Sequence, residues 1–177
     1  MQSRLCIACN WLVMLGALAI ADLAAAEAAE AAGCDAAEYR AFDFWVGDWE
    51  VRLADGSLAG HNAVRHEEGG CMVRESWRGA SGGTGSSINY FEPVNRIWRQ
   101  IWVSPTTNID ISGTAAQGSV VLSGTITYRA SRERFPFRGS WTRLPDGRVR
   151  QYFEESRETG VWQPWFEGFY TRQQPSD

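Results

Sequence analysis

The stretch FWVGDWEVRL, residues 44–53, alternates between two kinds of side chain. One face of an extended chain carries Trp45, Gly47, Trp49, Val51 and Leu53, and the other carries Phe44, Val46, Asp48, Glu50 and Arg52. Because successive side chains of a β-strand point to opposite faces, this alternation predicts a strand with one buried and one more polar face. The stretch therefore favours a fold built from β-strands.

Similar segments follow along the rest of the chain. Further strands are expected at residues 58–67, 71–78, 86–92, 97–104, 108–115, 119–128, 135–144, 149–156 and 162–172. Turn residues such as Asp55-Gly56 and Pro145-Asp146-Gly147 separate them, and a glycine-rich loop spans residues 79–85. The one helix candidate is residues 35–42, directly before the first strand.

Short connections make sequential strands pair as neighbours, and a flat sheet of ten strands would expose two long edges. Closure removes both edges. We therefore expect an all-β protein, a single antiparallel up-and-down β-barrel of about ten strands with a short N-terminal helix. A β-sandwich is the alternative. A barrel of this size has room for one small ligand.

The N-terminal segment has the pattern of a signal peptide. Arg4 precedes the apolar run of residues 11–20, and alanines at 24–26 offer a cleavage site. We expect residues 1–26 to be a signal peptide, 27–34 a linker, 35–173 the barrel domain and 174–177 a C-terminal tail. The mature protein would then be exported, periplasmic or secreted, with no stable membrane span; an uncleaved membrane anchor is the alternative.

Cysteine usage fits an oxidising compartment. Cys6 and Cys9 leave with the signal peptide, so Cys34 and Cys71 remain as a pair and are predicted to form a disulfide. An alternative is lipidation of Cys34, since residues 31–34 read AAGC. That segment lies well past the apolar run, which favours the disulfide.

Charge and composition exclude several classes of function. The net charge is -4, whereas a nucleic-acid surface needs concentrated basic residues. The chain has no lysine, which excludes a lysine Schiff base. Its two histidines, His61 and His66, are five residues apart on one expected strand and so face opposite ways, which argues against a shared metal site. We predict no metal and no cofactor.

Gly47-Asp48-Trp49 at the start of the first strand resembles the Gly-x-Trp signature of lipocalins and related calycins. The wider pattern of residues 42–51, 68–71 and 89–91 resembles a bacterial family of exported lipocalin-like barrels whose domain has no assigned function. The resemblance covers about residues 35–172. It implies a calycin-type barrel in which Arg172 packs across Trp49, and it implies no substrate.

Alternation places Glu75 with Cys71, Val73 and Trp77 on one face of a strand, so this carboxyl group is expected to point inward. A buried carboxylate needs a partner or a raised pKa, and Arg99 or Arg138 could supply the partner. The residues expected to line a cavity are Glu75, Trp77, Tyr90, Trp102, Trp141, Phe153 and Phe166, although the aromatic members could equally form packed core. The strand at residues 97–104 is apolar on both faces and cannot be oriented.

No catalytic signature is identified. Residues 79–83, GASGG, match the nucleophile elbow Gly-x-Ser-x-Gly, but strands flank them on both sides and no helix follows, which favours a hairpin loop. Three hypotheses remain: a protein that binds a small apolar or amphipathic molecule, an isomerase- or cyclase-type enzyme using an inward carboxylate, and an interaction module with a filled core. The sequence does not decide the oligomeric state.

Overall fold

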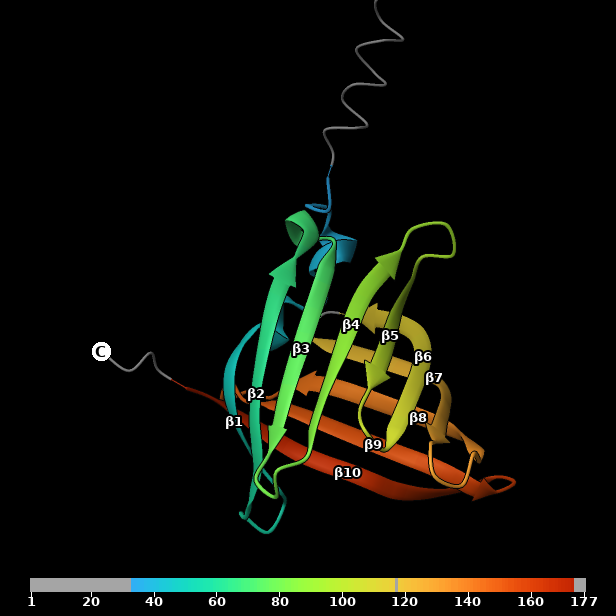
Figure 1. Ribbon diagram of the computed structural model, residues 1–177. Coiled ribbons are helices and arrows are strands. Elements are labelled where there is room, and N and C mark those ends of the chain that lie inside the picture. The colour runs from blue at the N-terminus through green and yellow to red at the C-terminus, as the bar shows by residue number, and fades with distance from the viewer. Residues whose placement is uncertain (1–32, 117, 174–177) are drawn as a thin grey trace, which may run out of the picture. The chain divides into compact units, whose positions relative to one another are not determined.

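The computed structural model describes residues 33–116 and 118–173, and ten strands make up most of them (Figure 1). The strands are β1 (Gly47–Arg52), β2 (Leu58–Glu67), β3 (Met72–Gly79), β4 (Thr84–Glu92), β5 (Ile97–Val103), β6 (Thr107–Ala116), β7 (Ser119–Tyr128), β8 (Arg134–Arg143), β9 (Val149–Glu158) and β10 (Val161–Arg172). The expected signal peptide and the tail at residues 174–177 lie outside the described residues.

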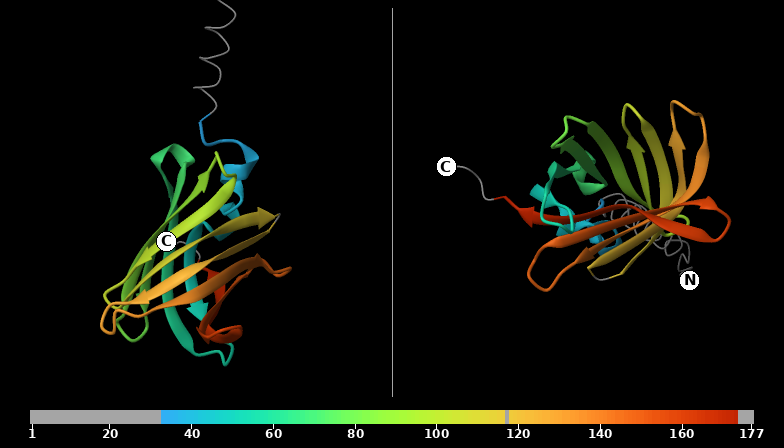
Figure 2. Two further views of the ribbon diagram at one scale, coloured as in Figure 1. Left: turned by 90° about the vertical axis from the view of Figure 1, so that its right-hand side faces the viewer. Right: turned by 90° about the horizontal axis from the view of Figure 1, so that it is seen from below.

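The strands form a closed barrel. Each pairs antiparallel with its neighbour in sequence, and β1 pairs with β10 to complete the ring. Two further views show the strands from the side and from below (Figure 2). The predicted up-and-down barrel is therefore confirmed, and the sandwich alternative is wrong.

The expected short helix at residues 35–42 is present as the 3-10 helix η1 (Ala37–Arg40), and a second 3-10 helix, η2 (Asp43–Trp45), follows it. A further turn, η3 (Glu68–Gly70), joins β2 to β3. Isolated helices this short are unstable in water, so packing against the barrel decides their conformation. Of the described helices, none is long and apolar enough to cross a membrane.

The turns η1 and η2 close one end of the barrel, which we call the closed end. Phe42 and Trp45 are fully buried there, and the ring of Phe42 contacts Trp98 and Trp141 with centroid separations of 4.9 and 5.3 Å. Trp98 also donates from Nε1 to the carbonyl oxygen of Glu38 at 3.0 Å. Aromatic packing thus fills this half of the barrel.

One disulfide bond and the side chain of Arg172 stabilise the closed end. Cys34 and Cys71 form the predicted disulfide, with their Cα atoms 4.9 Å apart, so the sulfur of Cys34 is not available for lipidation. The guanidinium of Arg172 lies 4.4 Å from the centroid of the Trp49 ring and donates to the carbonyl oxygen of Val46 at 2.9 Å. Arg172 on the last strand therefore packs across Trp49 on the first.

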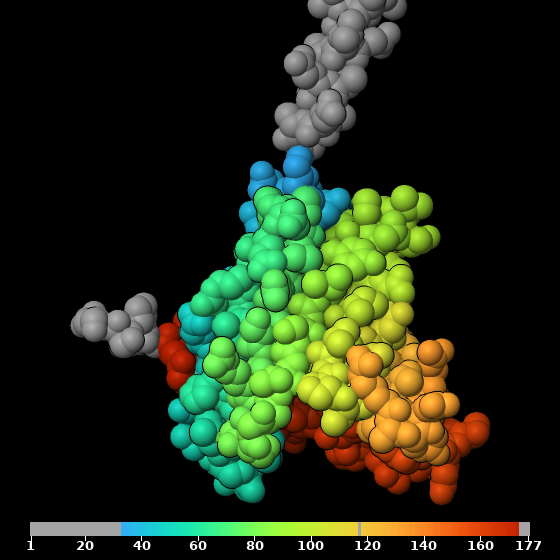
Figure 3. Space-filling model, in the orientation of Figure 1, coloured from blue at the N-terminus to red at the C-terminus, as the bar shows by residue number. Residues whose placement is uncertain are grey.

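The structure settles the orientation of β5. Trp98 and Gln100 are buried inside the barrel, whereas Val103 is 48% exposed on the outer face. Ion pairs occupy the outside nearby, for example Arg99 with Asp110 at 2.9 Å. The outer faces of β2–β5 form a continuous wall in the space-filling view (Figure 3).

Candidate functional site

A cavity of about 280 Å³ occupies the half of the barrel opposite the closed end. Its deep part is polar, its walls are aromatic, and it extends to the β3–β4 loop. The lining residues are Ala59, Glu75, Trp77, Gly79, Ser81, Gly83, Gln100, Trp102, Ile109, Gln151, Phe153, Trp165, Phe166 and Tyr170. We call this space the barrel cavity, and the end that holds the β3–β4 loop the loop end.

Inward-facing glycines explain why the aromatic side chains leave a space. A Cβ atom at Gly85 would overlap the ring of Trp102, and one at Gly139 would overlap the ring of Phe153. The ring of Phe166 stands in the same way over Gly168. Because a glycine has no side chain, each ring can lie close to the barrel wall, and the centre stays open.

The deep part of the cavity is a network of neutral amides and hydroxyls around Glu75, which is 3% exposed. Its Oε1 accepts a hydrogen bond from Nδ2 of Asn62, and its Oε2 accepts one from Oγ of Ser87, both at 2.7 Å. Ser87 Oγ in turn accepts from Nδ2 of Asn89 at 2.9 Å. The hydroxyl proton of Ser87 is therefore directed at Glu75.

The network continues onto neighbouring strands. Gln100 on β5 donates from Nε2 to Oδ1 of Asn89 at 2.8 Å, which leaves its Oε1 as an acceptor. On the other side, Tyr170 on β10 donates its hydroxyl to Oε1 of Gln151 on β9. Polar groups thus form an arc over β9, β10 and β2–β5, whereas β6–β8 contribute apolar side chains such as Ile109.

Burial governs the titration of this site. It raises the pKa of Glu75 from 4.5 to about 7, against the opposing effect of the hydrogen bonds from Ser87 and Asn62. Burial, together with the nearby Glu75 carboxylate, raises the pKa of Tyr170 well above its ordinary value. Glu75 can therefore exchange a proton near neutral pH, while Tyr170 stays protonated.

The structure brings together most of the expected cavity residues. Glu75, Trp77, Trp102, Phe153 and Phe166 line the barrel cavity.

Two of the expected residues lie elsewhere. Tyr90 alternates with the buried Asn89 and Phe91, so it faces outward from β4 and does not line the cavity. Trp141 points inward but is fully buried near the closed end, 5.1 Å from Phe153 between ring centroids. Alternation predicts on which face of a strand a side chain lies. How deep that side chain lies along the barrel depends on which end of the barrel is filled by other side chains.

The prediction that Arg99 or Arg138 pairs with Glu75 is wrong. Arg99 pairs with Asp110, and Arg138 pairs with Glu154 at 2.6 Å, both on the outer face. The neutral groups of the network take their place.

Sequence reasoning did not identify several site residues. These residues are Asn62, Ser87, Asn89 and Tyr170, and alternation in their strands places each on the inward face. The sequence signal that could identify them is a polar residue at a position where alternation directs the side chain inward.

A second hydrogen-bonded group holds the edge of the cavity at the loop end. Trp165 donates from Nε1 to the hydroxyl of Tyr128 at 3.0 Å, and that hydroxyl donates to Glu155 at 2.6 Å. Arg157 pairs with Glu155 at 2.6 Å and lies over the ring of Tyr128. Trp165 is thereby fixed beside the cavity.

Neither histidine lies in the cavity. His61 contacts the side chain of Gln173 at 3.2 Å on the outer face, and His66 pairs with Asp43 at 2.8 Å beside the closed end. The Gly-x-Ser-x-Gly segment forms the hairpin loop between β3 and β4, as expected, and Ser81 within it lies at the edge of the cavity.

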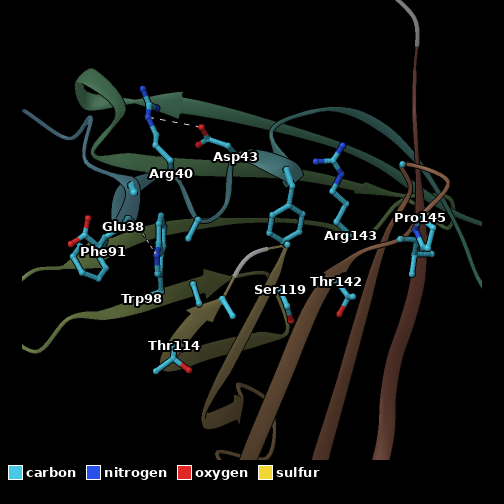
Figure 4. Close-up of a pocket in the computed structure, with 18 of the residues that line it drawn as sticks. Glu38, Arg40, Asp43, Phe91, Trp98, Thr114, Ser119, Thr142, Arg143 and Pro145 are labelled. Atoms are coloured by element: carbon cyan, nitrogen blue, oxygen red, sulfur yellow. Dashed lines mark hydrogen bonds and ion pairs between the residues drawn. The ribbon is translucent and has the colours of Figure 1, made fainter.

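A wider hollow of about 1520 Å³ lies at the closed end, between η1 and η2 and the loops beyond β6 and β8 (Figure 4). Its volume exceeds that of an ordinary small-molecule pocket. Glu38, part of its lining, already pairs with Arg96 at 3.0 Å. We therefore take the barrel cavity, which is smaller and has convergent polar groups, as the candidate site.

Comparison with known proteins finds no matching protein-family model and no curated protein that is significantly similar to the chain.

Proposed function

We propose that this protein binds a small, mainly apolar molecule in the barrel cavity. The observation that carries the proposal is the cavity itself, an aromatic chamber of about 280 Å³ with the Glu75 network at its deep end. Ligand sites are typically apolar spaces with a few convergent polar groups that fix orientation.

The volume limits the size of the ligand. An engineered apolar cavity of roughly 150 Å³ holds benzene, so about twice that volume suits a molecule of one or two rings or a short branched chain. A long fatty-acid chain would extend past the loop end into solvent. The cavity supports this proposal over an interaction module, which would have a filled core.

Tryptophan fluorescence tests the proposal directly, because Trp77, Trp102 and Trp165 line the cavity. We expect saturable quenching by one- and two-ring molecules. In a Gly139→Trp variant, the new indole and the displaced Phe153 should occupy the lumen, and the quenching should disappear. A matched Val121→Trp variant, changed on the exposed face of β7, should bind as the wild type does. Equal quenching in the lumen-filled variant would contradict the proposal.

An enzyme is the second candidate, and one observation favours it. A carboxyl group whose pKa is about 7 is suited to general acid–base chemistry near neutral pH, and Glu75 lines the cavity within the same network as Tyr170. An isomerase- or cyclase-type reaction would use Glu75 as the proton carrier. Turnover that survives in Glu75→Gln would contradict this candidate.

Export to an oxidising compartment, periplasmic or extracellular, is part of the proposal. The Cys34–Cys71 disulfide supports it, since such bonds persist mainly outside the cytosol. The kinship with lipocalin-like barrels is likewise proposed, and the packing of Arg172 across Trp49 beside Gly47 supports it. Recovery of the mature chain from a periplasmic or culture fraction, with its N-terminus after residue 26, would test the export.

A further inference from the structure

We propose that the natural ligand of the barrel cavity is an organic cation, a protonated amine on a small aromatic or branched apolar body, whose ammonium group pairs with the carboxylate of Glu75. The inference rests on the proposed binding function and names the chemical class of its ligand. Three features of the cavity lead to it: the direction of the hydrogen bonds at Glu75, the charges around it and the nature of the walls.

The hydrogen bonds at Glu75 are arranged for a carboxylate. Both of its oxygens accept, one from the amide nitrogen of Asn62 and one from the hydroxyl of Ser87. Ser87 cannot reverse its bond easily, because its oxygen already accepts from Asn89 at 2.9 Å and from Gln100 at 3.5 Å, which uses both of its lone pairs. A neutral acid would have to place its own proton against one of these donors, whereas an anion satisfies both.

The charge of that carboxylate has no protein partner. Among the described residues that line the cavity, no arginine or histidine is present, and the whole chain contains no lysine. Every group that faces Glu75 from the neighbouring strands is formally neutral: Asn62 on β2, Ser87 on β4, Gln100 on β5, Gln151 on β9 and Tyr170 on β10. A buried carboxylate without a counter-charge is costly, and a cationic ligand would supply the missing charge.

The walls of the cavity suit the apolar body of such a ligand. Phe166 lies 6.2 Å from Trp77 and 6.4 Å from Phe153 between ring centroids, and Trp165 lies 6.2 Å from Phe153. These rings would enclose an aromatic or branched group while the ammonium group reaches the carboxylate at the deep end. The Oε1 atom of Gln100 adds an acceptor beside Glu75. An anionic ligand, by contrast, would meet the carboxylate with nothing to neutralise it.

Three probes that share a phenylethyl group test the inference: 2-phenylethylamine, 2-phenylethanol and 3-phenylpropanoate. Calorimetric titration at pH 8 should give at least about tenfold tighter binding of the amine than of the alcohol, with the carboxylate weakest; tenfold corresponds to one desolvated ion pair of modest strength. In Glu75→Gln the amine should fall to the affinity of the alcohol, whose own binding should be retained. Glu154→Gln, on the outer face, is the matched control and should keep the preference for the amine.

The pH dependence provides an independent readout. Between pH 8 and pH 6 the ionised fraction of Glu75 falls about tenfold, so amine binding should weaken about tenfold while binding of the alcohol stays constant. Tyr170 remains protonated throughout this range. The dependence should vanish in Glu75→Gln.

The outcomes separate this inference from the proposed function. If the alcohol binds as well as the amine, with no effect of pH or of Glu75→Gln, the cationic ligand is wrong and the binding function stands. If none of the three probes binds at millimolar concentration, the binding function itself is contradicted.

Discussion

Glu75 is the residue on which the chemistry of this barrel depends. It is fully enclosed, its partners are neutral, and its pKa lies near 7 because burial opposes its charge. Proteins usually pair a buried carboxylate with arginine, but the arginines at Arg99 and Arg138 are engaged outside the barrel. The unpaired carboxylate should therefore be visible in the stability of the protein.

Stability should fall as the pH rises, because Glu75 holds its proton in the folded state up to about pH 7 and releases it near 4.5 when unfolded. This contribution is fully present below pH 4.5 and is lost as the pH passes through 7, at a cost of about 3 kcal/mol. Glu75→Gln cannot ionise. Relative to the wild type, its free energy of unfolding should gain about 3 kcal/mol between pH 4.5 and pH 8, as measured by urea denaturation.

The outer-face variant Glu154→Gln is the control and should follow the wild type through the same range of pH. A constant difference between Glu75→Gln and the wild type would show that Glu75 titrates in the folded protein as it does in the unfolded chain.

Alternation along one strand was sufficient to place Glu75 inside the barrel, since Val73 and Trp77 flank it at positions i−2 and i+2. It could not identify the hydrogen-bond partners. Asn62 and Ser87 lie 13 and 12 residues away, and they meet Glu75 only through the register of β2 and β4 against β3. Their role depends on pairing between strands, which a single chain pattern does not specify.

At the scale of elements, the two ends of the barrel have separate tasks. The turns η1 and η2 insert Phe42 and Trp45 into the closed end and leave the cavity at the other end free. The disulfide attaches the chain before η1 to the start of β3. The proposed binding site and the closed end are therefore built from different residues.

Removal of the disulfide should destabilise the fold and leave binding intact. Cys34 and Cys71 are 37 residues apart, and a loop of that size corresponds to about 4 kcal/mol at most in the chain-entropy description. We expect the double variant Cys34→Ala/Cys71→Ala to lose about 2–4 kcal/mol in guanidinium denaturation. The reduced wild type should match it. A loss of cavity binding in the folded double variant would contradict the separation of the two ends.

Strand positions were predictable because turn residues punctuate the chain, and the bounds of β2 and β7 agree with expectation. The orientation of β5 was not predictable. This strand is apolar on both faces, and only its pairing with β4 and β6 directs Trp98 and Gln100 inward. The short helix expected at residues 35–42 is present as η1, and the sequence did not reveal that η2 follows it and that Phe42 and Trp45 are buried at the closed end.

At the scale of the whole molecule, the barrel depends on the pairing of its first and last strands. The β1–β10 pair joins residues more than 100 positions apart, for example Trp49 with Arg172. Contacts between residues so far apart in sequence carry a large entropy cost of loop closure. We therefore expect the barrel to open first at the β1–β10 pair, which we call the seam. The side chain of Arg172 reinforces it from the end.

Arg172→Ala should loosen this seam selectively. The variant loses the contact with the Trp49 ring and the hydrogen bond to Val46, which together contribute about 1–2 kcal/mol. Hydrogen exchange should show faster exchange in β1 and β10 and unchanged rates in β6–β8. Arg134→Ala, which removes only a surface bond to Thr127, is the control. Uniform acceleration across all strands would show that the barrel opens as one unit.

The glycines behind the aromatic rings determine how wide the cavity is, because each lets a ring lie close to the barrel wall. A ligand in the cavity would contact the ring and not the glycine. A single methyl group at Gly139 would push Phe153 inward and shorten the space, while the carboxylate at the deep end keeps its partners. In the proposed binding site, preference for ligand size and preference for ligand charge would thus depend on separate residues. Evolution can adjust one without disturbing the other, so descendants of this barrel could exchange a larger guest for a smaller one and still select for the same charge.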